Sequence, residues 1–165
     1  LREVVRVLKP GGRFVIAGEP TRIGHWYARH LSRATWETAT RISRLPPLRG
    51  TWARAQAELD ESSRAAALEA VVDLHTFDPA QLAAMARRAG AEHVGTATEE
   101  LLSAFAGWPI RTFEYAVAED ALGFGWAKFA YGTWKNLMKV DAVLGRVVPQ
   151  RFFYNVGVTG TKPLR

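Results

Sequence analysis

The 165-residue sequence predicts an α/β fold, and three features of its patterning indicate this class. Segments with apolar residues at helical spacing alternate along the chain with short runs typical of strands. Proline and glycine separate helix from strand, as at Lys9-Pro10-Gly11-Gly12. Hydrophobic residues make up 48% of the chain and charged residues 23%, a balance that excludes disordered and collagen-like proteins.

The first third of the chain predicts a helix, a strand and a second helix. Residues 1–8 carry one apolar stripe at helical spacing, with no capping residue before it and no initiating methionine. We therefore expect the chain to be the C-terminal piece of a longer protein. Residues 13–18 predict a strand, and its core from Phe14 to Ala17 is apolar on both faces, as in a sheet covered on both sides. Residues 23–45 predict a helix that two prolines end.

The remaining elements follow from capping signals and periodicity. Residues 51–72 predict an acidic, alanine-rich helix. Asp78-Pro79 combines a helix N-cap with proline at the first helical position, and Gly90 is the natural C-cap of that helix. Further along, the patterns predict a strand at 92–98, aromatic-rich helices over 99–150 and a closing strand at 152–160.

Charge is distributed unevenly along the chain. Residues 1–54 hold 11 basic and 3 acidic side chains, whereas residues 55–100 hold 3 basic and 9 acidic ones. The arginines at 29, 33, 41 and 44 follow helical spacing, so we expect them on a solvated helix face. We do not expect nucleic-acid binding, because no run of consecutive basic residues and no recognition motif accompanies the excess.

Several site chemistries are excluded by residue type or spacing. The absence of cysteine excludes a disulfide framework, a thiolate nucleophile and any Cys-ligated metal. The four histidines show no metal-ligand spacing, so we expect no metal site. There is no Gly-x-Ser-x-Gly elbow, no secretory signal pattern and no apolar stretch long enough to span a bilayer. We expect a cytoplasmic protein.

Residues 6–16, Arg-Val-Leu-Lys-Pro-Gly-Gly-Arg-Phe-Val-Ile, resemble the segment that joins a helix to the fifth strand in class I S-adenosylmethionine-dependent methyltransferases. Glu19-Pro20 is similar to the usual end of that strand. Residues 76–90 resemble the family's next helix, and 92–98 correspond to its sixth strand. Residues 156–163, ending in Gly-Thr-Lys-Pro, resemble its closing strand. The segments occur in the family's order.

This resemblance implies a fold and a domain organisation. The chain would be a single partial methyltransferase domain over 1–165, built on the C-terminal half of a Rossmann-like methyltransferase sheet. Strand 152–160 would lie in the middle, antiparallel to both 13–18 and 92–98, and strand 13–18 would have a free apolar edge. Segments 21–75 and 99–150 are too long for connecting loops, so we expect them to be helical additions over the sheet.

The resemblance also implies S-adenosylmethionine as the methyl donor. The family binds it with a glycine-rich turn after the first strand and an acidic residue after the second, and neither is present in this sequence. The stretch Gly123-Phe124-Gly125 lacks a preceding strand and a third glycine. Cofactor-binding residues are therefore unassigned, and we expect the chain alone to be inactive and not to bind S-adenosylmethionine appreciably.

The methyl acceptor would lie at the carboxyl end of the sheet, where α/β folds bind ligands. The aromatic content of the added helices suggests a small, fairly apolar molecule. Candidate acceptor-binding residues are Glu19, His25, Trp26, Tyr27 and Asn155. No catalytic residue is assigned, because methyl transfer mainly needs in-line placement and a dry site. The atom methylated and the oligomeric state stay open.

Two other functions fit the same sequence. A non-enzymatic module could dock its basic first third and the segment 123–154 on a membrane surface or a protein partner. The mixture of Lys128, Lys135 and Lys139 with large apolar residues suits peripheral contact through an interfacial helix. An RNA-directed methyltransferase is the third possibility, and its RNA binding would depend on salt.

Overall fold

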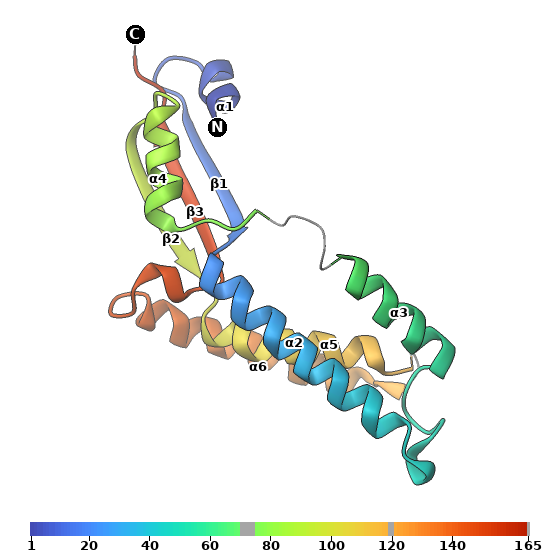
Figure 1. The fold of residues 1–165 in the computed structure, drawn as a ribbon. Coiled ribbons are helices and arrows are strands. Elements are labelled where there is room, and N and C mark those ends of the chain that lie inside the picture. Colours follow the sequence, from blue (N-terminus) through green and yellow to red (C-terminus); the bar gives the residue numbers. More distant parts are fainter. Residues whose placement is uncertain (70–74, 119–120, 165) are drawn as a thin grey trace. The chain divides into compact units, whose positions relative to one another are not determined.

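The computed structural model describes residues 1–69, 75–118 and 121–164, which form a mixed α/β structure (Figure 1). The chain divides into two compact units. The sheet unit comprises Leu1–Trp26, His75–Leu101 and Val140–Arg165, and the helical unit comprises Tyr27–Leu74 and Leu102–Lys139. The elements are α1 (Arg2–Val7), β1 (Arg13–Pro20), α2 (Arg22–Ser43), η1 (Pro46–Leu48), α3 (Gln56–Glu69), α4 (Pro79–Arg88), β2 (Glu92–Glu99), α5 (Leu102–Ala116), α6 (Phe124–Leu144), η3 (Gln150–Phe152) and β3 (Asn155–Thr161).

The three strands form one sheet in the order β1-β3-β2. β3 is antiparallel to both neighbours, and its Val158 lies opposite Ile16 of β1 and Thr96 of β2. The predicted strand order and strand directions are therefore confirmed. Within the described residues, β1 pairs with a strand on one side only, apart from a single bridge between Thr21 and Phe77 beyond its end.

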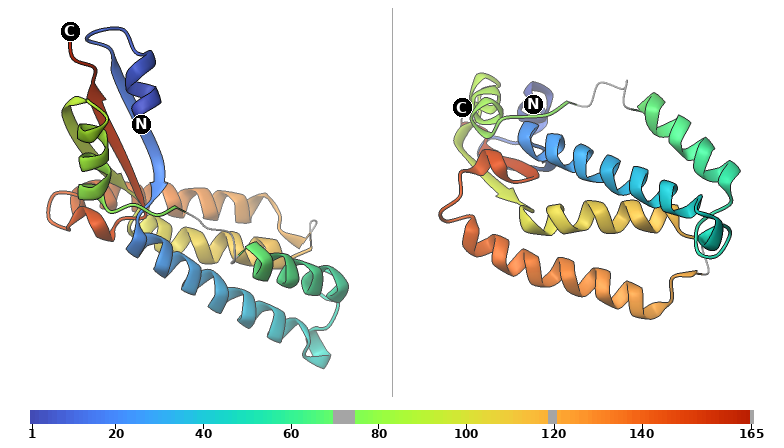
Figure 2. Two further views of the ribbon diagram at one scale, coloured as in Figure 1. Left: turned by 45° about the horizontal axis from the view of Figure 1, so that its top comes forward. Right: turned by 60° about the horizontal axis from the view of Figure 1, so that its bottom comes forward.

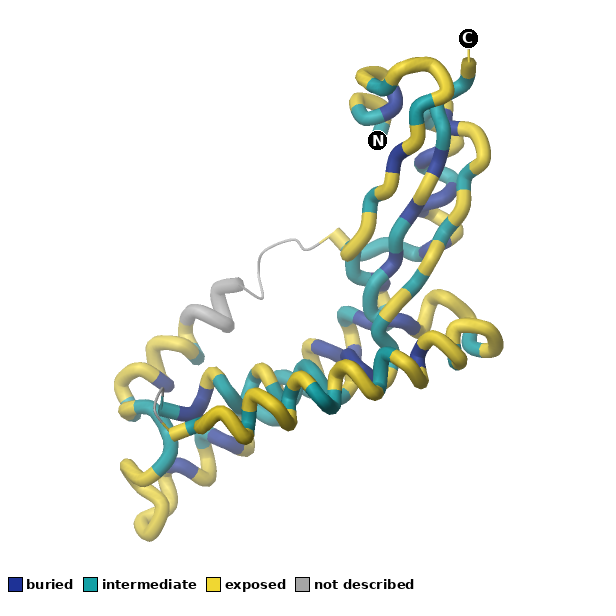
Figure 3. Tube along the Cα trace, turned by 180° about the vertical axis from the view of Figure 1, so that it is seen from behind, coloured by how far each residue is buried: buried dark blue, intermediate teal, exposed yellow. Residues whose placement is uncertain are grey.

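One face of the sheet carries the core of the sheet unit. Val156 and Val158 of the middle strand are almost fully buried, at 1% and 0% exposure. They pack with Phe14 of β1 and with side chains of α1 and α4, so both of these helices cover the same face. In Figure 3 the buried positions follow the middle strand, and exposed ones alternate along the strands beside it. Burial of this apolar row stabilises the unit.

The opposite face of the sheet is open, which corrects the prediction that both faces of 13–18 are covered. Phe14 is buried and Ile16 half-buried, whereas Val15 is 71% exposed and Ala17 is exposed too. Directly opposite residues of an antiparallel pair share a face, so the exposed Thr159 lies beside Val15. Both helices packed on β1 lie on the other side, and within the described part of the sheet unit no helix packs on this face.

The closing strand begins later than predicted. Residues 150–152 form η3 after Pro149, and Phe153 donates its backbone N–H to the carbonyl of Gln150. The expected alternation over 152–160 is therefore wrong for its first three residues. Because this turn interrupts the alternation of buried and exposed side chains, Phe153 is buried, at 1% exposure, like Val156 and Val158. β3 keeps the predicted alternation from Asn155 onward.

The helix boundaries largely follow the predicted signals. Asp78 caps α4, because its Oδ1 accepts a hydrogen bond from the backbone N–H of Ala80 at 2.9 Å, and Gly90 adopts the left-handed φ of 90° just after the helix. The helix predicted over 51–72 begins only at Gln56. The segment before Gln56 bonds to another part of the chain instead, because the carbonyl of Trp52 accepts a hydrogen bond from the backbone N–H of Ala118. Residues 70–72 of that prediction lie outside the described residues.

The helical unit is held together by aromatic side chains between its helices. Its buried core contains Ala39, Leu59 and Ala116, with Trp36, Trp52, Ala53 and Phe113 packed around it. The Phe113 ring lies 5.7 Å from the Trp52 ring and 5.4 Å from the Trp126 ring, measured between ring centroids. Figure 2 shows α2, α5 and α6 running side by side.

The arginines of α2 are exposed, as predicted. Arg33 pairs with Glu37 one turn along at 2.7 Å, and this guanidinium lowers the pKa of Glu37. Arg44 pairs with Asp60 of α3 at 2.9 Å. These pairs are solvated, so each contributes little to stability. Among the described helices, none is both long enough and apolar enough to cross a membrane.

Candidate functional site

A β-bulge near the end of β1 determines which way Glu19 points. Ile16 lies opposite Val158 and Glu19 opposite Val156, so two residues of β1 oppose one of β3. Gly18 lies in the bulge with a φ of 86°, a conformation that glycine adopts without strain. The extra residue places half-buried Glu19 on the helix-covered face with Val156. Without the bulge its side chain would lie on the open face.

Thr21 joins three segments of the sheet unit just after β1. It is 1% exposed, and its hydroxyl donates to the carbonyl of Phe153 while accepting from the backbone N–H of Gly24 at 2.9 Å. Its own N–H donates to the carbonyl of Tyr154 at 2.7 Å. Thr21 is thus the N-cap of α2 and fixes that helix against the segment that leads into β3.

Asn155 and Glu100 form a polar pair where β2 ends and β3 begins. The side-chain amide of Asn155 donates to Oε2 of Glu100 at 2.9 Å, and both residues are half-buried. Glu100 has a φ of 65°, which is unfavourable for a residue with a side chain, and its carbonyl accepts from the N–H of Tyr154 at 2.7 Å. Backbone strain of this kind occurs at functional sites, so Glu100 is a candidate site residue.

Asp141 supports this end of the sheet from α6. It is 3% exposed, and its Oδ2 accepts a hydrogen bond from the backbone N–H of Leu101 at 3.0 Å. Leu101 follows Glu100 directly, so the buried carboxylate fixes the backbone next to the candidate site. A carboxylate that accepts a backbone N–H makes a stronger hydrogen bond than a neutral acceptor does.

Replacing Asp141 by alanine is expected to destabilise the sheet unit by about 2 kcal/mol, because the half-buried backbone N–H of Leu101 loses its acceptor. Asp141→Asn keeps an acceptor of the same shape and is expected to cost roughly half as much. Urea unfolding followed by far-ultraviolet circular dichroism measures both values. Equal stability of the alanine variant and the parent chain would contradict this role.

The three predicted site residues at the start of α2 do not share one environment. His25 is half-buried and its backbone N–H donates to the carbonyl of Thr21 at 2.8 Å. Trp26 is 61% exposed. Tyr27 belongs to the helical unit, where it is 5% exposed and its ring stacks on Phe105 with centroids 4.4 Å apart. Consecutive residues of a helix point about 100° apart, so this divergence follows from helix geometry.

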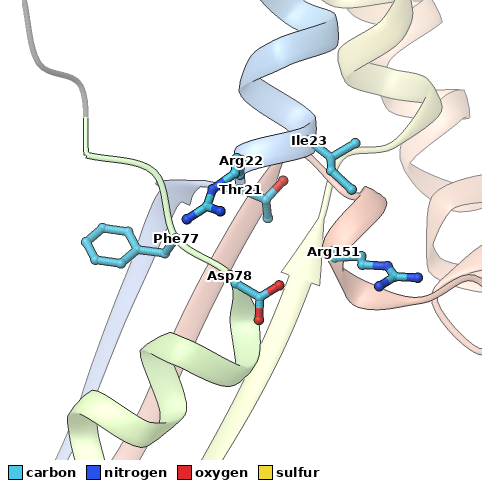
Figure 4. Close-up of a pocket in the computed structure, with 6 residues that line it drawn as sticks. All are labelled: Thr21, Arg22, Ile23, Phe77, Asp78 and Arg151. Atoms are coloured by element: carbon cyan, nitrogen blue, oxygen red, sulfur yellow. The ribbon is translucent and has the colours of Figure 1, made fainter.

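A pocket of about 220 Å³ lies beside this end of β1, between the starts of α2 and α4 (Figure 4). It is lined by Thr21, Arg22, Ile23, Phe77, Asp78 and Arg151. Its volume is below the range usual for sites that enclose a drug-sized molecule. In Figure 4 the guanidinium of Arg151 points away from the other labelled side chains, so the two arginines do not converge on one ligand.

The structure therefore separates the predicted candidates. Glu19 lies on the covered face of the sheet, and Asn155, next to Val156 in β3, lies on the opposite face beside Pro20 and Glu99. No group of described side chains could hold a metal ion. Gly123 and Gly125 lie at the start of α6, and in the part of the chain described here no strand leads into them, so they do not form the turn of a dinucleotide-type site.

Sequence reasoning missed three residues of this region: Thr21, Glu100 and Asp141. Thr21 carried a signal, since threonine between a proline and a helix is a common N-cap. Asp141 carried no such signal, because its partner, the backbone N–H of Leu101, is 40 residues away in the sequence. Glu100 carried no signal either. Its hydrogen-bond partners are Tyr154 and Asn155, which lie 54 and 55 positions later in the sequence.

Compared with known proteins, the chain matches no family model, and no curated protein or solved structure matches it either.

Proposed function

We propose that the chain is the acceptor-side portion of an S-adenosylmethionine-dependent methyltransferase that modifies a small, fairly apolar molecule. The observation that carries the proposal is the sheet order β1-β3-β2, with the last strand in the middle and antiparallel to both neighbours. The resemblance to methyltransferases implied this arrangement, because residues 156–163 resemble the closing strand of that family. Strands that follow one another in sequence usually pair, so chain order alone would not place the last strand between the other two.

The free edge of β1 supports the part of this proposal in which other strands of the protein bind the cofactor. Between Phe14 and Ala17 the strand carries no charge, and Val15 is 71% exposed. An apolar strand edge without charges or proline readily pairs with another strand. The cofactor-binding strands would align with this edge, and the helices next to them would cover the open face beside Val15 and Thr159. Those strands are not among the described elements.

The Asn155–Glu100 pair suits the acceptor side of the reaction. If the acceptor is a hydroxyl or an amine, a proton leaves it during methylation, and a positioned carboxylate within hydrogen-bond reach can take that proton. Glu100 stands at the carboxyl end of β2, and Asn155 orients its Oε2 at 2.9 Å. We assign proton acceptance to Glu100 and its orientation to Asn155. The covered-face residue Glu19 then has no part in the proton transfer.

The proposal is tested with the whole encoded protein, including any residues that the gene specifies before Leu1. We expect it to transfer labelled methyl groups from S-adenosylmethionine to some members of a panel of small aromatic alcohols, amines and carbon acids. No transfer to any acceptor class, by a protein that binds the cofactor, would contradict the methyltransferase assignment.

Glu100→Gln tests the assigned proton acceptor. This change keeps the hydrogen-bonding shape of the side chain but removes its basicity, so kcat should fall roughly 100-fold with KM little changed. Glu99→Gln is the matched control, because the neighbouring carboxylate is exposed. If both variants keep full kcat and the same pH profile, Glu100 does not accept the proton.

A further inference from the structure

One row of exposed residues runs along α6. Phe124, Lys128, Tyr131, Lys135 and Lys139 follow one another at spacings of three or four, so they lie on one side of the helix. We call these five residues the outer row. Phe124 is 75% exposed and Tyr131 is 61% exposed, and the three lysines are exposed as well. Single exposed apolar side chains are common, but two exposed aromatic rings on one side of the same helix are more informative.

The opposite side of α6 packs within the helical unit, which shows that the outer row faces away from that unit's interior. The Trp126 ring lies 5.4 Å from that of Phe113, and its Nε1 donates to Glu114 of α5 at 2.7 Å. Thr133 and Leu137 follow Trp126 by seven and eleven residues, so they lie on the same side of α6, and both are half-buried. These contacts fix the rotation of α6 about its axis.

The outer row is cationic, and α6 itself contributes no exposed carboxylate. The only acid of α6 is Asp141, which is 3% exposed and hydrogen-bonded to a backbone N–H. Within the described ranges the lysines form no ion pair. Instead, Lys128 Nζ lies 4.8 Å from the Phe124 ring centroid and Lys135 Nζ lies 6.0 Å from that of Tyr131. Each ring is thus next to an ammonium group.

We propose that the outer row of α6 docks on the surface of an anionic lipid bilayer. Aromatic rings settle at the level of the lipid carbonyls, and lysines extend their alkyl stems along them to reach the phosphates. Phe129 and Trp134, which are 53% and 38% exposed, flank the row and widen its apolar contact. Since α6 has no exposed acid among its own residues, this cationic face complements the negative charge of such a bilayer. This inference is independent of the proposed methyl transfer.

Cosedimentation of the 165-residue chain with vesicles tests the inference. The vesicles contain phosphatidylcholine with about one quarter phosphatidylserine, an anionic lipid that raises the local concentration of basic segments. We expect binding at low salt, strong weakening at about 0.5 M salt because charges are screened, and little binding to pure phosphatidylcholine. In the triple variant Lys128→Gln, Lys135→Gln, Lys139→Gln, each lost lysine should weaken binding about fivefold. Together the three changes should weaken it roughly 100-fold.

A second variant tests how much the aromatic rings contribute to binding. Phe124→Ala with Tyr131→Ala removes the apolar contact and leaves all three lysines, so we expect weaker binding with the same steep salt dependence. Both rings are exposed, so the double variant should fold as the parent does. Circular dichroism checks this before binding is measured.

The matched charge control is Arg2→Gln, Lys9→Gln, Arg87→Gln, three exposed cations of the sheet unit. It loses the same formal charge as the lysine triple variant, and we expect it to bind nearly as well as the parent. Equal binding by the two triple variants would mean that net charge alone acts and would overturn the inference. Failure of the parent chain to bind, equal binding to neutral vesicles, or a dimer that buries the outer row would also overturn it.

Discussion

Gly24→Ala is expected to lower the free energy of unfolding of the sheet unit by about 3 kcal/mol, the upper part of the range for overpacked sites. A Cβ at this position would lie 2.5 Å from the Cα of Tyr154 and 2.8 Å from the carbonyl oxygen of Phe153. Both are backbone atoms, so no side chain can rotate away. Either α2 moves off the segment before β3, or that segment moves off the core.

Gly107→Ala is the matched control for this prediction. Gly107 lies inside α5, and a Cβ there would meet no other atom within 4 Å. Alanine is the better helix former, so stability should rise by about 0.5–1 kcal/mol. Urea unfolding of both variants gives the comparison. If Gly24→Ala is no less stable than the parent chain, the close approach of α2 to Tyr154 does not exist in solution.

Thr21→Val is expected to destabilise the sheet unit by about 2–3 kcal/mol, because one hydroxyl makes two buried hydrogen bonds. Valine has nearly the same shape but can neither donate to the Phe153 carbonyl nor cap the N–H of Gly24. Two polar backbone groups then remain buried without a partner. The loss of the cap accounts for about 1 kcal/mol of this effect.

Thr21→Ser removes the methyl group of the side chain and keeps its hydroxyl, so it tests the two contributions separately. Serine keeps both hydrogen bonds, so most of the stability should return, and hydrogen exchange at Gly24 should stay slow. Thr112→Val in α5 is the control, since the carbonyl its hydroxyl contacts, that of Trp108, is one helical turn away. We expect it to change stability by less than about 0.5 kcal/mol. Equal losses at positions 21 and 112 would contradict the role of Thr21.

The sequence contained enough information for the elements that depend on local signals. The sequence predicts α4 from its Asp78 cap and from Gly90 after its end, because each of these residues acts on the backbone within a few residues of itself. The antiparallel middle position of β3 came from the resemblance of 156–163 to a known closing strand, not from periodicity. Strand order depends on contacts between distant segments, and local patterns do not encode them.

The remaining features depend on contacts across the chain. Thr21 and the Phe153 carbonyl are 132 residues apart, and Asn155 is 55 residues from Glu100. The apolar run from Phe14 to Ala17 predicted cover on both faces, but the helices that pack on β1 all lie on one side. The face of Glu19 depends on a single bulge at Gly18, and a bulge reverses every later side chain in a strand.

Calorimetric titration with S-adenosylmethionine tests the central claim most directly. The 165-residue chain alone should give no heat of binding in the micromolar range, since it lacks the glycine-rich turn, while the whole encoded protein should bind one molecule per chain. Hydrogen exchange should be slower in the whole encoded protein than in the 165-residue chain at the backbone amides of β1 that face away from β3, because a neighbouring strand would cover them. Micromolar binding by the 165 residues alone, or none by the whole encoded protein, would contradict the assignment.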